Sequence, residues 1–554
     1  MAEPSFRCQA RAFCLGLFLV GSPRAGKCDY LIITDSMFSA QAQRLADLRH
    51  SLTPNVAKQP CIAKMADIYR QYPPTGPKWK SVQAFLKTAY QLNQPDLAHV
   101  VLLGDASLDP ASSLDHVPTF TEQIQSLQHF SPDTVFHDTF SSDDAYADFF
   151  DSLNVDSLPS QAFAIGRIPA DSPLQADAYL DKVEAYEAHY AYGPGAFTYG
   201  FLNDDDLQMG SFEGLDPIRN MPEENQEIWD SLAVKPFVRR MLSIEFPIQP
   251  TNTKPAAEDS TLGLFNAAPA RIYFVGHGSP NQLTDENIFH VPGDLARLRP
   301  KTLQPIVSML ACTTARFADP DSQSMGEQML FHPHGAVAFL GGTIPTFPDP
   351  NNRLFIHWNR LASAGGTLGS TFAKAKDSVW DYRNSAAYAL LGDPALTLRV
   401  PAFDLVPAVG SGAGRLVLQN AGAAGDSAYF QLVRLDSIPF NFVISPLNTY
   451  LKDRLYPREV LVAEGRASLS AGGTVTFMFP TIGDPRAMAL KVMTWNSRGM
   501  RYGHFPLESL GVLALRPFGK PSIQPVGWHL ALQNNRLVLV GSGRRLGLDG
   551  KAIR

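Results

Sequence analysis

The chain has 554 residues, with 47 lysines and arginines against 53 aspartates and glutamates, so its formal net charge at pH 7 is -6. A chain of this length is too long for one ordinary domain and can bury several hydrophobic cores. The mild acidity and the absence of long basic tracts argue against nucleic acid as a partner. Five cysteines without a C-x-x-C pair predict neither a disulfide framework nor a zinc site.

The N-terminus carries Arg7 and Arg11 ahead of an apolar stretch, residues 12–20, that is too short to span a bilayer. This pattern is typical of a bacterial signal peptide, although the cleavage site that follows is poor. We therefore predict that residues 1–27 are a signal peptide or an N-terminal stub, and that the protein is extracytoplasmic, either secreted or at the cell surface. No other apolar stretch reaches membrane-spanning length.

Residues 28–198 alternate short apolar runs with helical stretches, which predicts βαβ units and a parallel sheet. The clearest strands are Leu31–Ile33 and Val100–Leu103. Cys28 and Cys61 would pair as a disulfide in an exported protein, or stay two buried free thiols, which we favour.

A second alternation of strands and helices begins at Tyr199–Asn203 and continues to residue 400. Two of its apolar runs, Arg271–Val275 and Pro305–Ala311, have the length and composition of buried strands in a parallel sheet. His277 follows the first run and Cys312 follows the second. Because parallel strands end at the same edge of a sheet, where open α/β sheets place their sites, the two side chains can meet there. The imidazole would take the thiol proton, and the thiolate would attack a carbonyl carbon.

Three consecutive acids, Asp204, Asp205 and Asp206, follow the strand that we expect beside the His277 strand. A carboxylate that accepts a hydrogen bond from the imidazole would fix its tautomer and stabilise the imidazolium. The alternative is a solvated or calcium-binding acidic turn, so a structural calcium ion stays open.

Many segments between residues 28 and 400 resemble, in order, the gingipain-type cysteine peptidases, which have a caspase-like fold. The segments are Asp29–Asp35, Ala66–Tyr69, Val100–Asp105, Ile165–Pro169, Tyr273–Ser279, Ala311–Phe317, Met325–Leu330, Gly335–Thr343 and Leu391–Leu396. The resemblance implies an α/β fold of two subdomains packed side by side with mostly parallel sheets, residues 28–198 and 199–400, with the chemistry in the second.

The resemblance also implies roles for individual residues. Cys312 would be the nucleophile, and the backbone amides of Gly278 and Cys312 would form the oxyanion hole. Asp205 falls nearest the family's acidic partner of the histidine. Glu213 and Asp216 could line a specificity pocket for arginine, although exposed surface acids are the simpler interpretation.

The nucleophile loop departs from the family at one position. The family more often has a glycine two residues after the cysteine, where this chain has Thr314. Glycine permits turns that other residues resist, so the shape of the oxyanion loop is open.

The composition changes after Pro401, where glycine-rich turns separate strand-like runs. Short strands without a helical period predict an antiparallel β-sandwich over residues 401–554, and gingipain-like peptidases commonly carry an immunoglobulin-like module here. The tail after Phe518 would either complete this sandwich or resemble a sorting domain. The break at Pro401 further predicts that residues 28–400 fold without the module.

These observations predict a cysteine endopeptidase that hydrolyses protein or peptide substrates with a Cys-His dyad and needs no cofactor for its chemistry. One alternative is a sortase-like transpeptidase that anchors exported proteins by passing the acyl group to an amine. Another is a catalytically inactive surface-binding module. Side-chain preference and oligomeric state stay open.

Overall fold

The structure is a computed structural model that describes residues 28–546 with internal gaps. Residues 1–27, which include the predicted signal peptide, and residues 547–554 lie outside the described part. The internal gaps are residues 110, 129–130, 153–159, 206, 209–218, 380, 409–410, 412–413, 421–425, 441–453, 479–484, 508–528, 534–535 and 542–543. Among the described residues, no helix has the length and apolarity that a membrane crossing requires.

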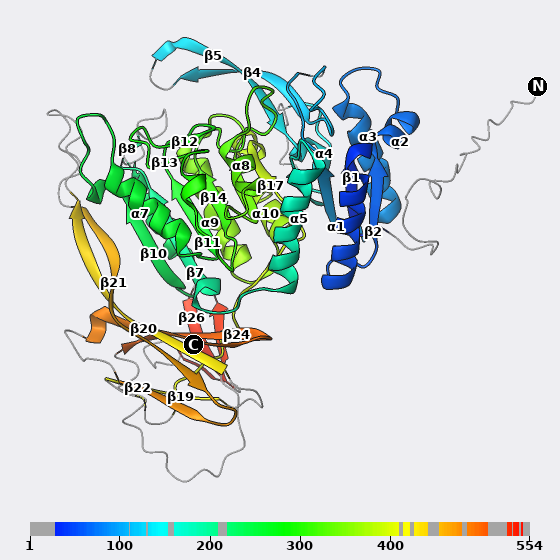
Figure 1. Cartoon of the computed structure of the whole chain (residues 1–554). Helices are drawn as coiled ribbons and strands as arrows, with labels where there is room; N and C mark the ends of the chain where they lie inside the picture. The colour runs from blue at the N-terminus through cyan, green and yellow to red at the C-terminus, as the bar shows by residue number, and fades with distance from the viewer. Residues whose placement is uncertain are drawn as a thin grey trace, which may run out of the picture.

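A ten-stranded sheet forms the centre of residues 28–400 (Figure 1). Neighbouring strands pair in parallel, except for β15 and β17, which are antiparallel. In spatial order the strands are β10 (Phe237–Leu242), β7 (Thr198–Asn203), β11 (Arg271–Val275), β14 (Ile306–Leu310), β15 (Ala338–Gly342), β17 (Tyr388–Leu391), β6 (Ala164–Ile168), β3 (His99–Leu103), β1 (Tyr30–Thr34) and β2 (Pro60–Lys64). The mostly parallel α/β fold is therefore confirmed, as are the individual strands predicted around His277 and Cys312.

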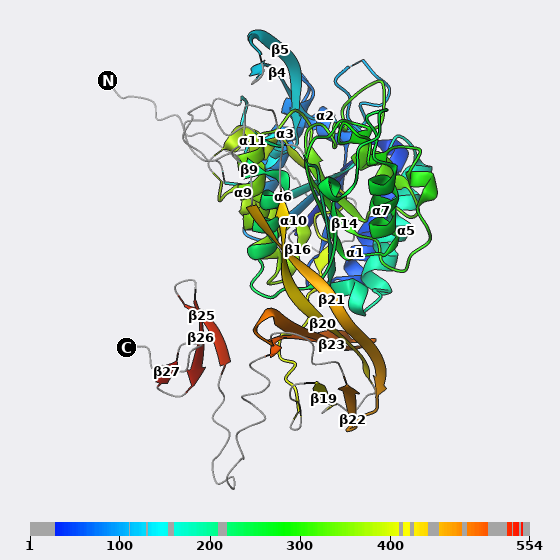
Figure 2. The same ribbon diagram turned by 90° about the vertical axis from the view of Figure 1, so that its left-hand side faces the viewer.

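Helices cover both faces of this sheet (Figures 1 and 2). One face carries α1 (Ser39–Leu52), α5 (Pro173–Ala188) and α7 (Pro255–Asn266). The other carries α3 (Trp79–Asn93), α6 (Met221–Asp230), α9 (Pro348–Ala362) and α10 (Leu368–Lys376). Strands such as β1, β3, β11 and β14 are buried along their whole length, because helices on both sides exclude water.

Shorter elements connect this framework. The helices are α2 (Met65–Gln71), α4 (Asp144–Ala147), α8 (Met325–Phe331) and α11 (Tyr382–Ala386). The paired strands are β4 (Phe120–Gln128) with β5 (Ser131–Ser142), β8 (Leu207–Gln208) with β9 (Arg219–Asn220), β12 (Gln282–Leu283) with β13 (Phe289–His290), and β16 (Gly366–Thr367) with β18 (Thr397–Leu398). Local capping explains where α8 begins: Ser324 and Glu327 form a reciprocal capping box.

The two predicted subdomains join edge to edge in one sheet. The contact between strands is a single parallel pair, Leu391 of β17 with Arg167 of β6. Buried polar groups reinforce it: Asp393 accepts hydrogen bonds from Arg49 Nε and from the Tyr30 hydroxyl, both at 2.8 Å. Because these side chains are almost completely buried, the Arg49–Asp393 pair fixes the closing segment of the second subdomain against the first.

Antiparallel sheets make up the C-terminal region, as predicted. A four-stranded sheet contains β21 (Arg454–Leu469), β20 (Asp426–Phe440), β23 (Met488–Asn496) and β24 (Gly499–Pro506), and a two-stranded sheet contains β19 (Arg415–Gln419) and β22 (Thr474–Met478). The tail forms its own sheet of β25 (His529–Gln533), β26 (Arg536–Gly541) and β27 (Arg544–Leu546). Among the described strands it pairs with no other sheet, so it does not extend the sandwich.

The four-stranded sheet packs against the second α/β subdomain, residues 199–400. Phe237, at the start of β10, lies with its ring centroid 5.1 Å from that of Tyr429 and 5.5 Å from that of Tyr502. Lys491 of β23 is fully buried and donates to the Pro236 carbonyl at 2.6 Å. A composition change at Pro401 therefore marks a change of fold class but not a boundary with few contacts.

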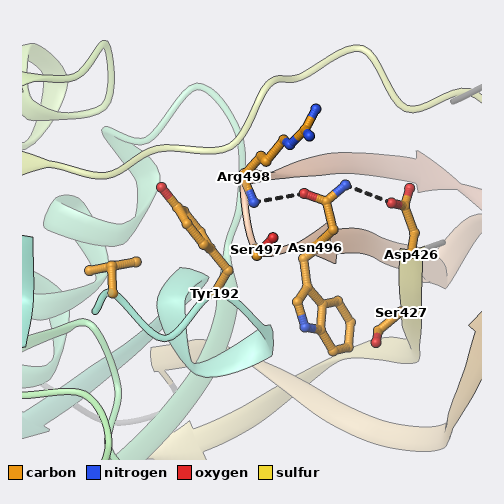
Figure 3. Close-up of a pocket in the computed structure, with 8 residues that line it drawn as sticks. Tyr192, Asp426, Ser427, Asn496, Ser497 and Arg498 are labelled. Carbon is orange, nitrogen blue, oxygen red and sulfur yellow. Dashed lines mark hydrogen bonds between the residues drawn. The ribbon is translucent and has the colours of Figure 1, made fainter. Parts of the chain in front are cut away.

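A pocket of about 550 Å³ opens in the seam between the two regions (Figure 3). Tyr192 faces it from the α/β region, and Asn496 and Arg498 face it from the C-terminal region. Tyr192 precedes the amino end of β7, so this pocket lies at the opposite edge of the sheet from Cys312.

Candidate active site

The register of β11 and β14 brings His277 and Cys312 to the same row of the sheet edge. Val275 pairs with Leu310, 35 positions later, and Cys312 likewise follows His277 by 35 positions. Each side chain therefore leaves the sheet two residues beyond the last paired position of its strand. The His277 side chain is exposed, whereas Cys312 is half-buried.

Gly278 lets the histidine loop lie directly against the cysteine loop. A Cβ atom at this position would stand 2.8 Å from the Ala311 Cβ and 3.2 Å from the Cys312 carbonyl oxygen. Contacts this short exclude any side chain, so only glycine permits this approach. The amides of Gly278 and Cys312 donate to no acceptor among the residues that the structure describes.

The nucleophile loop takes its left-handed turn at Thr313, where φ is 52°. A positive φ is strained for a β-branched residue, and strain of this kind is characteristic of functional turns. The next residue, Thr314, is completely buried, and a Cβ added at Gly341 would lie 2.7 Å from its hydroxyl oxygen. The loop is thus built without the glycine that the family more often has at position 314.

Thr346, in the loop after β15, contacts the Cys312 sulfur. Its amide nitrogen lies 3.5 Å from Cys312 Sγ, in donor geometry. Burial raises the pKa of the Cys312 thiol, whereas the amide and the hydroxyl of Thr346 oppose that rise by stabilising the thiolate. The Thr346 hydroxyl is held by Asn351 Nδ2 at 3.0 Å and lies 3.4 Å from the Tyr388 hydroxyl. No sequence motif identifies Thr346, Asn351 and Tyr388, because they come close to Cys312 only in the folded chain.

The acidic cluster is arranged differently from the prediction. Asp205 Oδ1 accepts from Lys254 Nζ at 2.6 Å and from the Ser243 hydroxyl at 3.2 Å. Asp204 instead accepts from the His277 backbone amide at 3.1 Å. Gly276 makes this approach possible, since a Cβ there would lie 2.6 Å from the Asp204 Cβ. The glycine before His277 was the sequence signal that could have favoured Asp204.

Three predicted acids cannot be placed, and one unpredicted acid lies near the site. Asp206, Glu213 and Asp216 fall outside the described residues. Glu224, in the first half of α6, is 1% exposed and lies within electrostatic range of the Tyr388 hydroxyl, as Cys312 does. Both groups raise the pKa of Tyr388, although burial is the largest cause of that rise.

The acidic group proposed to bind calcium already contains a lysine side chain. Asp204, Asp205 and Glu286 each offer an oxygen within 4.8 Å of the others, which suits a cation that prefers oxygen ligands. Lys254 Nζ, however, lies 2.6 Å from Asp205 and 3.4 Å from Glu286. With Lys254 in this position, the carboxylates already have a positive partner, and the residues present do not fit an additional divalent ion.

Known proteins resemble this chain over large parts of its length. The model of Peptidase family C25 matches residues 24–399. A curated relative, an uncharacterized protein from Archaeoglobus fulgidus, is 22% identical over 285 residues, which cover 48% of this chain and 61% of that protein. The chain therefore spans about 61% of the length of this relative.

The fold of this chain is similar to that of a solved cysteine proteinase. The crystal structure of the Arg-specific cysteine proteinase gingipain R is 15% identical, with a TM-score of 0.52, over 87% of this chain and 98% of that one. The complex of the Porphyromonas gingivalis RgpB pro- and mature domains is 14% identical, with a TM-score of 0.48, over 86% and 99% of the two chains. At such identities the first similarity establishes the fold alone, and it confirms the predicted gingipain-like architecture. Because the family model covers most of the sequence, the chain belongs to peptidase family C25.

Proposed function

We propose that this protein is a cysteine endopeptidase in which Cys312 is the nucleophile and His277 is the general base and acid. The observation that carries the proposal is the shared offset of 35 residues between the paired strands and between the two side chains. His277 takes the thiol proton as the thiolate attacks the scissile carbonyl, and it then returns the proton to the leaving amine. Water hydrolyses the acyl-enzyme in the second half of the reaction.

The oxyanion of the tetrahedral intermediate would be stabilised by the amides of Gly278 and Cys312. Two features support this assignment: both amides lack acceptors among the described residues, and Gly278 packs against the Cys312 carbonyl. Donors that are fixed before the reaction stabilise developing charge without having to reorient.

Asp204, rather than Asp205, would hold the histidine in place. Its carboxylate binds the backbone of His277 and not a substrate atom, so it acts as a positioning residue. Asp205 contributes indirectly through Lys254. Asp204→Asn should therefore lower kcat more than Asp205→Asn does, and equal effects would argue against this assignment.

We also propose that the protein acts outside the cytoplasm. Support comes from the arginines at positions 7 and 11 and the apolar residues 12–20 that follow them. N-terminal sequencing of protein recovered from the periplasm or medium of a bacterial host tests this. A new N-terminus, created by cleavage within about the first 30 residues, supports export. Full-length protein found only in the cytoplasm would contradict it.

The dyad is tested with Cys312→Ala and His277→Ala, assayed on a peptide library that also reveals the preferred cleavage sites. Each variant should lose on the order of 10³-fold or more of kcat/KM, because groups that act as a unit fail together. Cys61→Ala is the matched control, since this half-buried thiol lies on β2, and it should keep full activity. Near-normal turnover of either dyad variant would refute the assignment. Adding an amine nucleophile to the same assay distinguishes a hydrolase from a transpeptidase by the ratio of free acid to amide product.

A further inference from the structure

The Lys254 ammonium pairs with two members of a group of three carboxylates. Its side chain is 2% exposed, and its nitrogen lies 2.6 Å from Asp205 Oδ1 and 3.4 Å from Glu286 Oε1. Asp204 completes the group, in which one oxygen of each acid lies within 4.8 Å of the others. A buried lysine is expensive to desolvate, so its retention here requires carboxylate partners.

Lys254 connects loops that leave three different elements at the active-site edge. Asp205 follows β7, Ser243 follows β10, and Lys254 itself precedes α7, and Figure 1 shows these elements side by side. The Lys254 nitrogen reaches the Ser243 hydroxyl at 3.1 Å, and its backbone amide donates to the Glu286 carbonyl at 3.4 Å. One side chain thereby fixes the relative positions of segments that are far apart in the sequence.

His277 lies between two of these segments. On one side, Asp204 accepts its backbone amide. On the other, its carbonyl accepts from the Thr284 amide at 3.0 Å, two residues before Glu286. Lys254 therefore holds the residues on both sides of the histidine.

The charges explain why a cation is needed. Three carboxylates this close repel one another strongly where little water screens them. Oxygen ligands at such spacing suit a divalent ion such as Ca²⁺, which takes six to eight of them. An ammonium group supplies positive charge and three donors from within the chain, and it needs no ion from solution.

We propose that Lys254 is a positioning residue that takes the place of a divalent ion, holds the loops around His277 and makes hydrolysis independent of calcium. This inference rests on the proposed role of His277. It assigns to Lys254 a function through Asp204, Asp205 and Glu286, and it replaces the hypothesis of a structural calcium ion at this acidic turn.

The first test uses the unmodified protein, so it does not depend on whether a variant folds. After exhaustive treatment with EDTA, kcat should be unchanged, and added Ca²⁺ should have no effect. A loss of about tenfold or more on chelation that Ca²⁺ restores would overturn the proposal, because an ion would then be doing what we assign to the ammonium.

The second test removes the ammonium with Lys254→Ala. We expect kcat to fall about tenfold or more while KM changes by less than about threefold, because the histidine is misplaced but the substrate surface is intact. Millimolar Ca²⁺ should restore most of that loss by filling the space among the carboxylates. Activity within about twofold of wild type, or a loss that Ca²⁺ leaves unchanged, would refute the proposal.

Lys301→Ala is the matched control. Lys301 also secures α7, but at its other end, where its nitrogen donates to the Phe265 carbonyl at 3.2 Å. This variant should keep its kcat and should not respond to Ca²⁺. A similar loss of kcat in Lys301→Ala and Lys254→Ala would indicate only a displaced α7 and would count against the proposal. His277→Ala in the same assay separates the two hypotheses: if it stays active, the proposed function fails, whereas an inactive His277→Ala beside a normal Lys254→Ala refutes only the role of Lys254.

Discussion

Replacing Asn351 with alanine should raise the pKa of the Cys312 thiol. Asn351 Nδ2 can only donate, so Thr346 Oγ1 accepts from it and keeps its own proton free to donate. That hydroxyl is one of two Thr346 groups that oppose the effect of burial on Cys312. Without Asn351 the Thr346 hydroxyl is no longer held in this orientation, so one group that stabilises the thiolate is weakened and the pKa of Cys312 should rise.

The rate of thiol alkylation should fall by a smaller factor than the thiolate fraction does. For each unit by which the thiol pKa rises, the thiolate fraction at a pH below that pKa falls about tenfold. The intrinsic nucleophilicity of the thiolate rises about threefold over the same unit. Alkylation of Cys312 by iodoacetamide near pH 7 should therefore slow in Asn351→Ala, by about threefold for each unit of that rise. Measuring the full pH profile in a His277→Ala background isolates the thiol from its catalytic base.

The adjacent residue provides the control for this experiment. Asn352 is as deeply buried as Asn351, but its side-chain amide donates to Glu227 instead of Thr346. Asn352→Ala should lower the melting temperature without moving the alkylation profile. If the profile of Asn351→Ala superimposes on that of the control, the network behind Cys312 only stabilises the fold and the argument from the thiolate is refuted.

Three further predictions concern stability and redox state. Burial lowers the pKa of His99 to about 3, so its folded form stays neutral while the unfolded chain binds a proton below pH 6.5. Stability should thus fall between pH 6.5 and 3 by up to about 5 kcal/mol, and urea unfolding should show a smaller acid loss for His99→Gln; an unchanged loss would refute this. A chain that ends at Val400 should aggregate or unfold at a lower temperature than the full chain, because it exposes Phe237. Light scattering and thermal unfolding measure this, and a truncated chain that is soluble and active would contradict it. Cys28 and Cys61 are free, and burial, followed by the neighbouring Cys61 thiol, raises the pKa of Cys28. Oxidised glutathione should join the two thiols with a loss of two hydrogens by mass spectrometry, whereas two persistent thiols would contradict this.

The strands that carry His277 and Cys312 were predictable because their signals are local. Val275 and Leu310 end apolar runs of the length of buried strands, and a parallel sheet brings the ends of adjacent strands together. The sequence does not encode the offset of 35 residues at which the two strands pair. The prediction that the two side chains lie close together needed only that the strands be neighbours.

The identity of the acidic residue beside His277 was not predictable in the same way. Asp204 and Asp205 are adjacent and chemically identical, and successive side chains at a strand end point in different directions. The choice between them depends on Lys254, 49 positions from Asp205, and on Glu286 in the histidine loop. No periodicity or spacing encodes that contact.

The extent of the C-terminal contact shows the same limit. The change in composition at Pro401 was correctly associated with a change from α/β to antiparallel structure. It said nothing about Lys491 and Tyr502, which pack against the peptidase and form hydrogen bonds to it. Composition reports the kind of secondary structure, whereas an interface depends on which faces meet.

The sequence by itself therefore determined the class of each region, the strands that carry His277 and Cys312, and the peptidase family. Those properties follow from hydrophobic patterning and glycine placement, which act over a few residues. The tertiary structure alone decided the acid beside the histidine, the groups around the thiol and the partner of Lys254. A charge or a hydrogen-bonding group selects its partner by distance in space, and loops from separate strands acquire that proximity only when the sheet has formed.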